Sequence, residues 1–151
     1  MLAYVPIVHI VAAVLTVIEL GLMAYIVTPY DNSYYGPPSA KSFMMFNAVF
    51  TLLVLAYLAL TPRYFPRFFH QIAALALEAI TMIFWFAGSI ALAAGWAVPR
   101  CGANTYCGSI NAAVAFGFFI WALFTFLVVV DAREFLRSRS RPTTTKPYVS
   151  A

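Results

Sequence analysis

Four uninterrupted apolar runs, each 20 to 26 residues long, constrain this chain more than any other feature of its sequence. They cover residues 5–27, 42–61, 70–95 and 110–130. A helix needs about 20 residues to cross the hydrocarbon core of a bilayer. Backbone polar groups find no water in lipid, so runs of this length must form helices or the strands of a closed barrel. Because the runs show no period-two alternation, we expect four transmembrane helices.

The composition excludes a water-soluble globule. Apolar residues make up 64% of the chain and charged residues 9%, whereas soluble domains are about a quarter charged. A length of 151 residues allows one domain. We therefore predict an all-α membrane protein, an antiparallel bundle of four transmembrane helices over residues 5–131. Residues 132–151 are polar and rich in Arg, Pro and Thr, and we expect a basic, disordered tail.

The distribution of lysine and arginine predicts the orientation. With four spans, the N-terminus, the loop 61–69 and the tail share one side, which carries seven basic residues, while the other side carries two. The positive-inside rule then places both termini in the cytoplasm. Nucleic-acid binding is not expected, because no folded part presents a basic groove. The basic residues of the tail that we single out are Arg133, Arg137, Arg139 and Arg141.

The sequence Arg137–Arg141, in which serines alternate with arginines, directly follows the last span. The simpler interpretation is a stop-transfer anchor that sets the topology. The alternative is an electrostatic switch, because a basic juxtamembrane cluster is attracted to anionic lipids by about 1 kcal/mol per charge. Phosphorylation of Ser138 or Ser140 would weaken that attraction.

The only two cysteines, Cys101 and Cys107, lie in the loop predicted to face away from the cytosol. Such compartments are oxidising, so we expect a disulfide that staples the hairpin between the third and fourth spans. A catalytic redox pair is the alternative. Five intervening residues, and a loop between the cysteines without Lys or His, disfavour it, since activated thiol pairs are typically spaced C-x-x-C.

Four polar residues inside the spans are candidates for a functional site: His9, Glu19, Asn47 and Glu78. A rise of about 1.5 Å per residue places His9 at a depth near that of Glu78, and Glu19 near that of Asn47. We expect both carboxyl groups to be protonated, because removal from water disfavours the charged form. Interhelical hydrogen bonding is the favoured role, and an ion or proton pathway is the alternative. The spacing of the histidines predicts no metal site.

The third span resembles one family in particular. It contains Glu78, then Phe84-Trp85, then a run of small residues up to Ala93; a cysteine-bearing outer loop and the segment Ala112–Phe118 follow, and Gly21-Leu22 in the first span also fits. With four spans and both termini inside, this pattern is similar to the MARVEL family, specifically its small fungal members. The resemblance implies a non-enzymatic protein of membrane apposition, vesicle trafficking or microdomain organisation, with no catalytic residues and no cofactor.

The partners that this resemblance implies are membrane lipids, including sterols or anionic lipids, and other membrane proteins or further copies of the chain. We expect a multi-pass protein of the plasma membrane or the secretory pathway. A different class of function stays open. A membrane-embedded acid in the first span, here Glu19, resembles the small multidrug resistance transporters, so Glu19 and Glu78 could serve a small proton-coupled transporter. The chain could also be an accessory subunit of a larger membrane complex.

Overall fold

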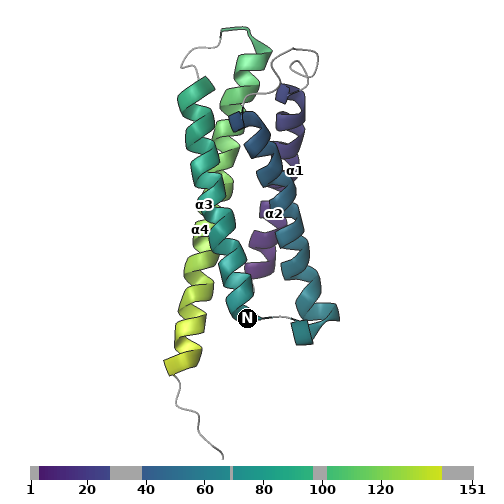
Figure 1. Ribbon diagram of the computed structural model, residues 1–151, viewed down its shortest axis with the longest axis vertical. Helices are drawn as coiled ribbons and strands as arrows, with labels where there is room; N and C mark the ends of the chain where they lie inside the picture. The colour runs from purple at the N-terminus through teal and green to yellow at the C-terminus, as the bar shows by residue number, and fades with distance from the viewer. Residues whose placement is uncertain (1–3, 28–38, 69, 97–101, 141–151) are drawn as a thin grey trace, which may run out of the picture.

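The structure, a computed structural model, describes residues 4–27, 39–68, 70–96 and 102–140. Within these residues the chain forms four long helices and no strand (Figure 1). The short 3₁₀ helix η2 (Pro66–Phe68) follows the second of them. All four are long and apolar enough to cross a membrane. The four helices are α1 (Val5–Val27), α2 (Ser39–Tyr64), α3 (Gln71–Trp96) and α4 (Thr105–Ser140).

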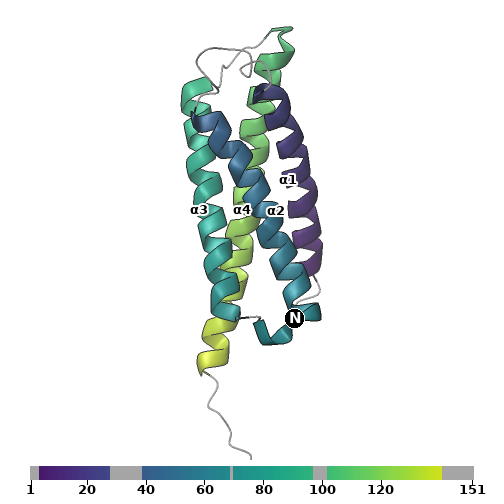
Figure 2. The ribbon, with the colours of Figure 1, turned by 45° about the vertical axis from the view of Figure 1, so that its right-hand side comes forward.

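The helices form an antiparallel bundle in which each packs against the two neighbours of a closed ring. The ring runs α1, α2, α3, α4 and back to α1. The start of α1 and the end of α4 lie at the same end of the bundle, which is also where η2 lies (Figures 1 and 2). We call this the η2 end, and the end where α1 stops and α4 begins the opposite end. The two diagonal pairs, α1 with α3 and α2 with α4, are joined by side chains alone.

Polar groups lie inside this bundle and large apolar groups lie outside. Glu19 is 0% exposed and Glu78 1%, whereas Ile10 is 64% exposed and Leu53 66%. A soluble domain shows the reverse distribution, because burying polar groups and exposing aliphatic ones is unfavourable in water. The distribution is expected where the solvent is lipid, so the structure agrees with the four spans predicted from the sequence.

Local capping explains why α4 begins five residues before the predicted span. Asn104 precedes the helix, and its Oδ1 accepts hydrogen bonds from the backbone N–H groups of Tyr106 at 3.0 Å and Cys107 at 3.3 Å. Asparagine is among the preferred N-cap residues, since its side chain satisfies N–H groups that have no partner within the helix. Gly102, with φ of +56°, supplies the left-handed backbone of the turn before it.

The far end of α4 corrects the prediction of a disordered tail from residue 132. The helix continues without a break to Ser140, and it projects past the other helices at the η2 end (Figure 1). Ala, Arg, Glu and Leu, which dominate residues 132–137, are strong helix formers. The 36-residue helix is about 54 Å long, so it exceeds the roughly 30 Å of a hydrocarbon core. Residues 141–151 lie outside the described part.

Candidate functional site

At the opposite end of the bundle, a buried lysine joins three helices. Lys41 of α2 is 0% exposed, and its Nζ donates a hydrogen bond of 2.7 Å to the Tyr106 hydroxyl of α4. The Tyr106 hydroxyl in turn donates to the Ile26 carbonyl of α1 at 3.3 Å. The ammonium group also lies 5.2 Å from the centre of the Tyr106 ring, in the range of a cation–π interaction. This contact therefore links the α2–α4 diagonal.

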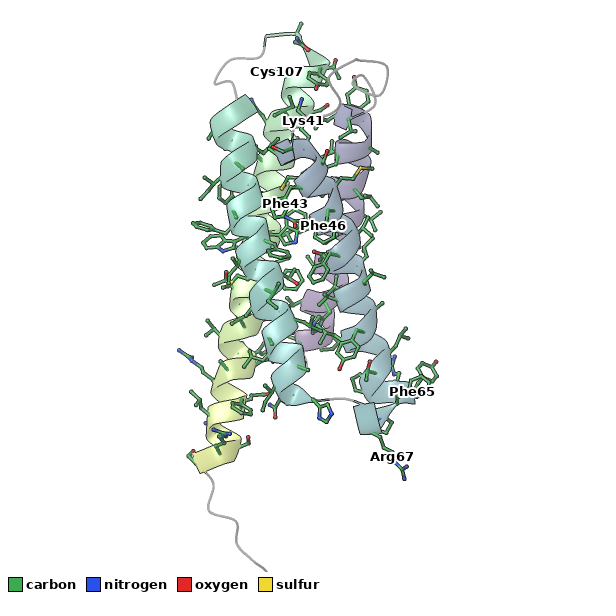
Figure 3. The ribbon with its side chains drawn as sticks, viewed as in Figure 1. Lys41, Phe43, Phe46, Phe65, Arg67 and Cys107 are labelled. Carbon is green, nitrogen blue, oxygen red and sulfur yellow. The ribbon has the colours of Figure 1, made fainter. Side chains whose placement is uncertain are left out.

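Sequence reasoning missed the role of Lys41, which it counted only as one of two basic residues on that side. The side chain lies near the bundle end where Cys107 lies (Figure 3). The available signal was its position one residue before the predicted second span, where a long lysine stem can follow apolar surface to a polar group. The identity of Tyr106 as acceptor depends on the packing of α4 and could not be read from spacing along the chain.

In the middle of the bundle, two polar side chains of α2 hold α3. Asn47 donates from Nδ2 to the Phe84 carbonyl at 2.9 Å. The indole N–H of Trp85 donates to the Thr51 hydroxyl at 2.8 Å, and that hydroxyl donates to the carbonyl of Asn47 at 2.7 Å. Trp85 is fully buried. These interhelical bonds satisfy polar groups that lipid cannot satisfy.

Two glycines allow the helices to approach closely at this level. A Cβ built on Gly88 would lie 2.6 Å from the Met44 Sδ and 3.0 Å from the Asn47 Nδ2. A Cβ built on Gly117 would overlap the Ser89 Oγ. Both positions therefore exclude larger side chains, as is typical of small residues at helix–helix interfaces in membranes.

Depth permits a contact between Glu19 and Asn47, and the structure does not make it. Both carboxyl oxygens of Glu19 and the Oδ1 of Asn47 are buried without a hydrogen-bond partner among the described residues. The reason is that depth alone fixes the level of a side chain and not its direction. The Asn47 amide is turned toward α3, where it bonds to the Phe84 carbonyl.

At the η2 end, the structure brings together His9 and Glu78, the other pair that depth suggested. The His9 Nε2 lies 3.6 Å from the Glu78 Oε1, which is within ion-pair range and longer than a hydrogen bond. Asp131 of α4, which sequence reasoning did not single out, lies close enough to Glu78 and Glu134 for the charges of these carboxyl groups to act on one another. This cluster joins α1, α3 and α4.

Three of the four predicted tail arginines are exposed on α4, and Arg139 lies 5.1 Å from the centre of the Phe135 ring. Ser138 and Ser140 donate hydrogen bonds to carbonyls of the preceding helical turn. The fourth arginine, Arg141, lies outside the described residues.

Cys107 is disulfide-bonded. Because Cys101 lies outside the described residues, the pairing of the two stays a prediction. Over the described ranges, no cluster of three or more His, Cys, Asp or Glu side chains is arranged to hold a metal ion.

Comparison with known families identifies the class of protein that this bundle represents. The profile of the MARVEL membrane-associating domain matches residues 3–130. Comparisons with curated proteins and with solved structures gave no match. The match covers most of the chain, which therefore belongs to the MARVEL family and is a multi-pass integral membrane protein with four helices.

Proposed function

We propose that this protein is a non-enzymatic organiser of the membrane. It acts through lipid and helix–helix contacts on its outer surface, in membrane microdomains, in trafficking or in a membrane-protein complex of the plasma membrane or secretory pathway. The observation that carries the proposal is the contrast between the inner faces of the helices, which contact one another, and the outer faces, which are free to contact other molecules. Among the described residues, four of the nine buried polar side chains make contacts between helices, namely Lys41, Asn47, Thr51 and Glu78. The surface offered to other molecules is largely apolar and aromatic.

Part of that surface is a row of four phenylalanines at the seam of α2 and α3. The Phe46 ring stacks on Phe43 and Phe50, with ring centres 6.5 and 5.8 Å apart. Phe84 of α3 contacts all three rings, at 5.7 to 6.5 Å. Figure 3 shows Phe43 and Phe46 on the same stretch of α2.

Such a row is suited to bind another helix or a lipid chain. Helix association in membranes depends on packing, because lipid tails are as apolar as the side chains. Aromatic pairs contribute about 0.5–1.5 kcal/mol beyond their buried area. Rings that already support one another also lose little conformational freedom on contact, which favours binding. Phe46, 53% exposed, is the most accessible of the four.

A small proton-coupled transporter is the second candidate, and the cluster of His9, Glu78 and Asp131 is the observation that favours it. Ionisable groups inside a membrane domain are rare and often mark proton relays. The unpartnered carboxyl group of Glu19 lies deeper in the same bundle. The first proposal accounts for the cluster as a link across the α1–α3 diagonal, and an accessory subunit of a larger complex would use the same outer surface.

Energy transfer between labelled copies tests the first proposal. Full-length chains carrying donor or acceptor dyes are reconstituted in phosphatidylcholine vesicles at a fixed protein-to-lipid ratio. We expect transfer above the level of random mixing, because the aromatic surface associates. Phe46→Ala should weaken the association constant by roughly fivefold or more, as loss of a central aromatic contact does. Phe119→Ala is the matched control, since Phe119 is 62% exposed and stacks on no other ring among the described residues.

The same vesicles, loaded with a pH-sensitive dye, separate the two candidates. The organiser predicts no proton flux in the wild type, in Glu19→Gln or in Glu78→Gln. Random mixing of the wild type, together with a proton flux that either substitution abolishes, would overturn the proposal in favour of the transporter.

A further inference from the structure

A groove of about 690 Å³ lies between α1 and α2 at the η2 end of the bundle. Its volume is within the roughly 300–1,000 Å³ of small-molecule sites. It exists because five of its lining residues are alanine or proline, whose short side chains leave the space between the helices unfilled. These five are Pro6 and Ala13 of α1 and Ala56, Ala59 and Pro62 of α2.

The walls of the groove are apolar, and the two exceptions are His9 and Arg63. His9 is held toward the interior by Glu78 at 3.6 Å. Arg63 stands in the last turn of α2 and is exposed. No carboxylate among the described residues lies within ion-pair distance of its guanidinium. The groove therefore has an apolar interior and one unneutralised positive charge at its end.

The level of Arg63 in the bilayer matches the level of lipid headgroups. It follows the apolar run 42–61, so its stem lies along the hydrocarbon boundary and its charged end lies among the headgroups. A guanidinium binds phosphate through two parallel hydrogen bonds. Pro62 and Leu58 also line the groove. Because proline has no N–H, the Leu58 carbonyl receives no helical hydrogen bond from residue 62.

We propose that this groove binds one anionic phospholipid, with an acyl chain between α1 and α2 and the phosphate on Arg63. The proposal rests on the function proposed above and specifies one lipid class and one site for it. Charge complementarity favours an anionic phospholipid over a sterol, because a sterol hydroxyl would leave the guanidinium without a counter-charge. Basic pockets between membrane helices bind anionic headgroups on the same physical grounds.

Arg67 provides a control that has the same charge and nearly the same position in the chain. It lies in η2, four residues after Arg63, and does not line the groove. Figure 3 shows its side chain pointing away from the bundle. A lipid attracted only by the net charge of this end would respond equally to the loss of either arginine, whereas a lipid bound in the groove responds to Arg63.

Native mass spectrometry of the full chain tests the site. The protein is extracted from vesicles of phosphatidylcholine and phosphatidylserine, and the lipids that stay bound are counted. We expect the wild type to retain one phosphatidylserine in preference to phosphatidylcholine. Arg63→Gln should lower this retention about tenfold, as expected for loss of a charge-assisted hydrogen bond, and Arg67→Gln should leave it unchanged.

A second pair of variants tests the acyl-chain part of the groove. Ala59→Leu should reduce retention because it fills the groove, and Ala76→Leu should not. Ala76 is also exposed and lies at a similar distance from the same end, but it is on α3 and outside the groove. Equal retention by wild type and Arg63→Gln, an equal loss in Arg67→Gln, or retention of neutral lipid alone would overturn the site. The energy-transfer experiment is repeated with Arg63→Gln. If copies of this variant still associate, the proposed organising function does not depend on the lipid site and stands even if that site is disproved.

Discussion

Replacing Trp85 with alanine is expected to lower the free energy of unfolding by about 3–5 kcal/mol, the range for deletion of a large buried aromatic side chain. Trp85 is the largest of the fully buried side chains, and its indole N–H donates to Thr51 across the α2–α3 interface. Alanine would leave a cavity that neighbouring helices fill only in part, and the Thr51 hydroxyl would lose a donor. Unfolding of the purified protein by SDS, followed by circular dichroism, measures the change.

One further variant separates the loss of the hydrogen bond from the loss of the ring, and a second variant serves as a control. Trp85→Phe keeps most of the ring volume and removes the hydrogen bond, so we expect a loss of about 1 kcal/mol. Trp121→Ala is the matched control, because Trp121 is only partly buried and packs against Phe86 and Phe118 near the surface. A loss in Trp85→Ala no larger than that in Trp121→Ala would contradict the packing described here.

Replacing Gly117 with leucine is expected to be the second most damaging change, with a loss of about 3 kcal/mol from overpacking. A Cβ at this position would overlap the Ser89 Oγ and would lie 3.2 Å from the Met44 Cε. The helices α3 and α4 would have to separate, and the close contact along their seam would be lost. The same SDS titration gives the magnitude.

Removing the atom that a side chain at position 117 would overlap tests whether this overlap causes the loss of stability. Gly117→Ala should destabilise the wild type, and it should do so less in a Ser89→Ala background, because the overlapping hydroxyl is gone. Gly21→Ala is the control: nothing lies within 4 Å of a Cβ at that position. Alanine there should stabilise the protein by about 0.5–1 kcal/mol through helix propensity. Equal effects at Gly21 and Gly117 would show that α3 and α4 are not in close contact.

The sequence predicted the spans well because the solvent acts on every residue of a helix that crosses lipid. The predicted first span, 5–27, has the same bounds as α1. The ends of α2 and α4 were less predictable, since local effects decide them. Asn104 caps α4 earlier than hydropathy suggests, and α2 continues through Pro62, because a proline in the last turn disrupts few helical bonds.

The interior contacts were predictable only in part. The depth of a residue along its helix can be read from the sequence, and it suggested that His9 pairs with Glu78. In the structure the His9 Nε2 lies 3.6 Å from the Glu78 Oε1. Rotation about the helix axis and the choice among neighbours depend on packing of all four helices. For that reason Asn47 bonds to the Phe84 carbonyl rather than to Glu19, and the buried contact of Lys41 with Tyr106 was not foreseen.

Protease accessibility of the two chain ends shows whether the four helices cross a bilayer and return the chain to the side where it started. The full chain carries a different epitope tag at each end and is inserted into sealed vesicles whose cytoplasmic face is outward. If both chain ends lie on the cytoplasmic face, added protease removes both tags without detergent. Removal of one tag while the other stays protected, or recovery of the chain in the soluble fraction, would contradict this arrangement.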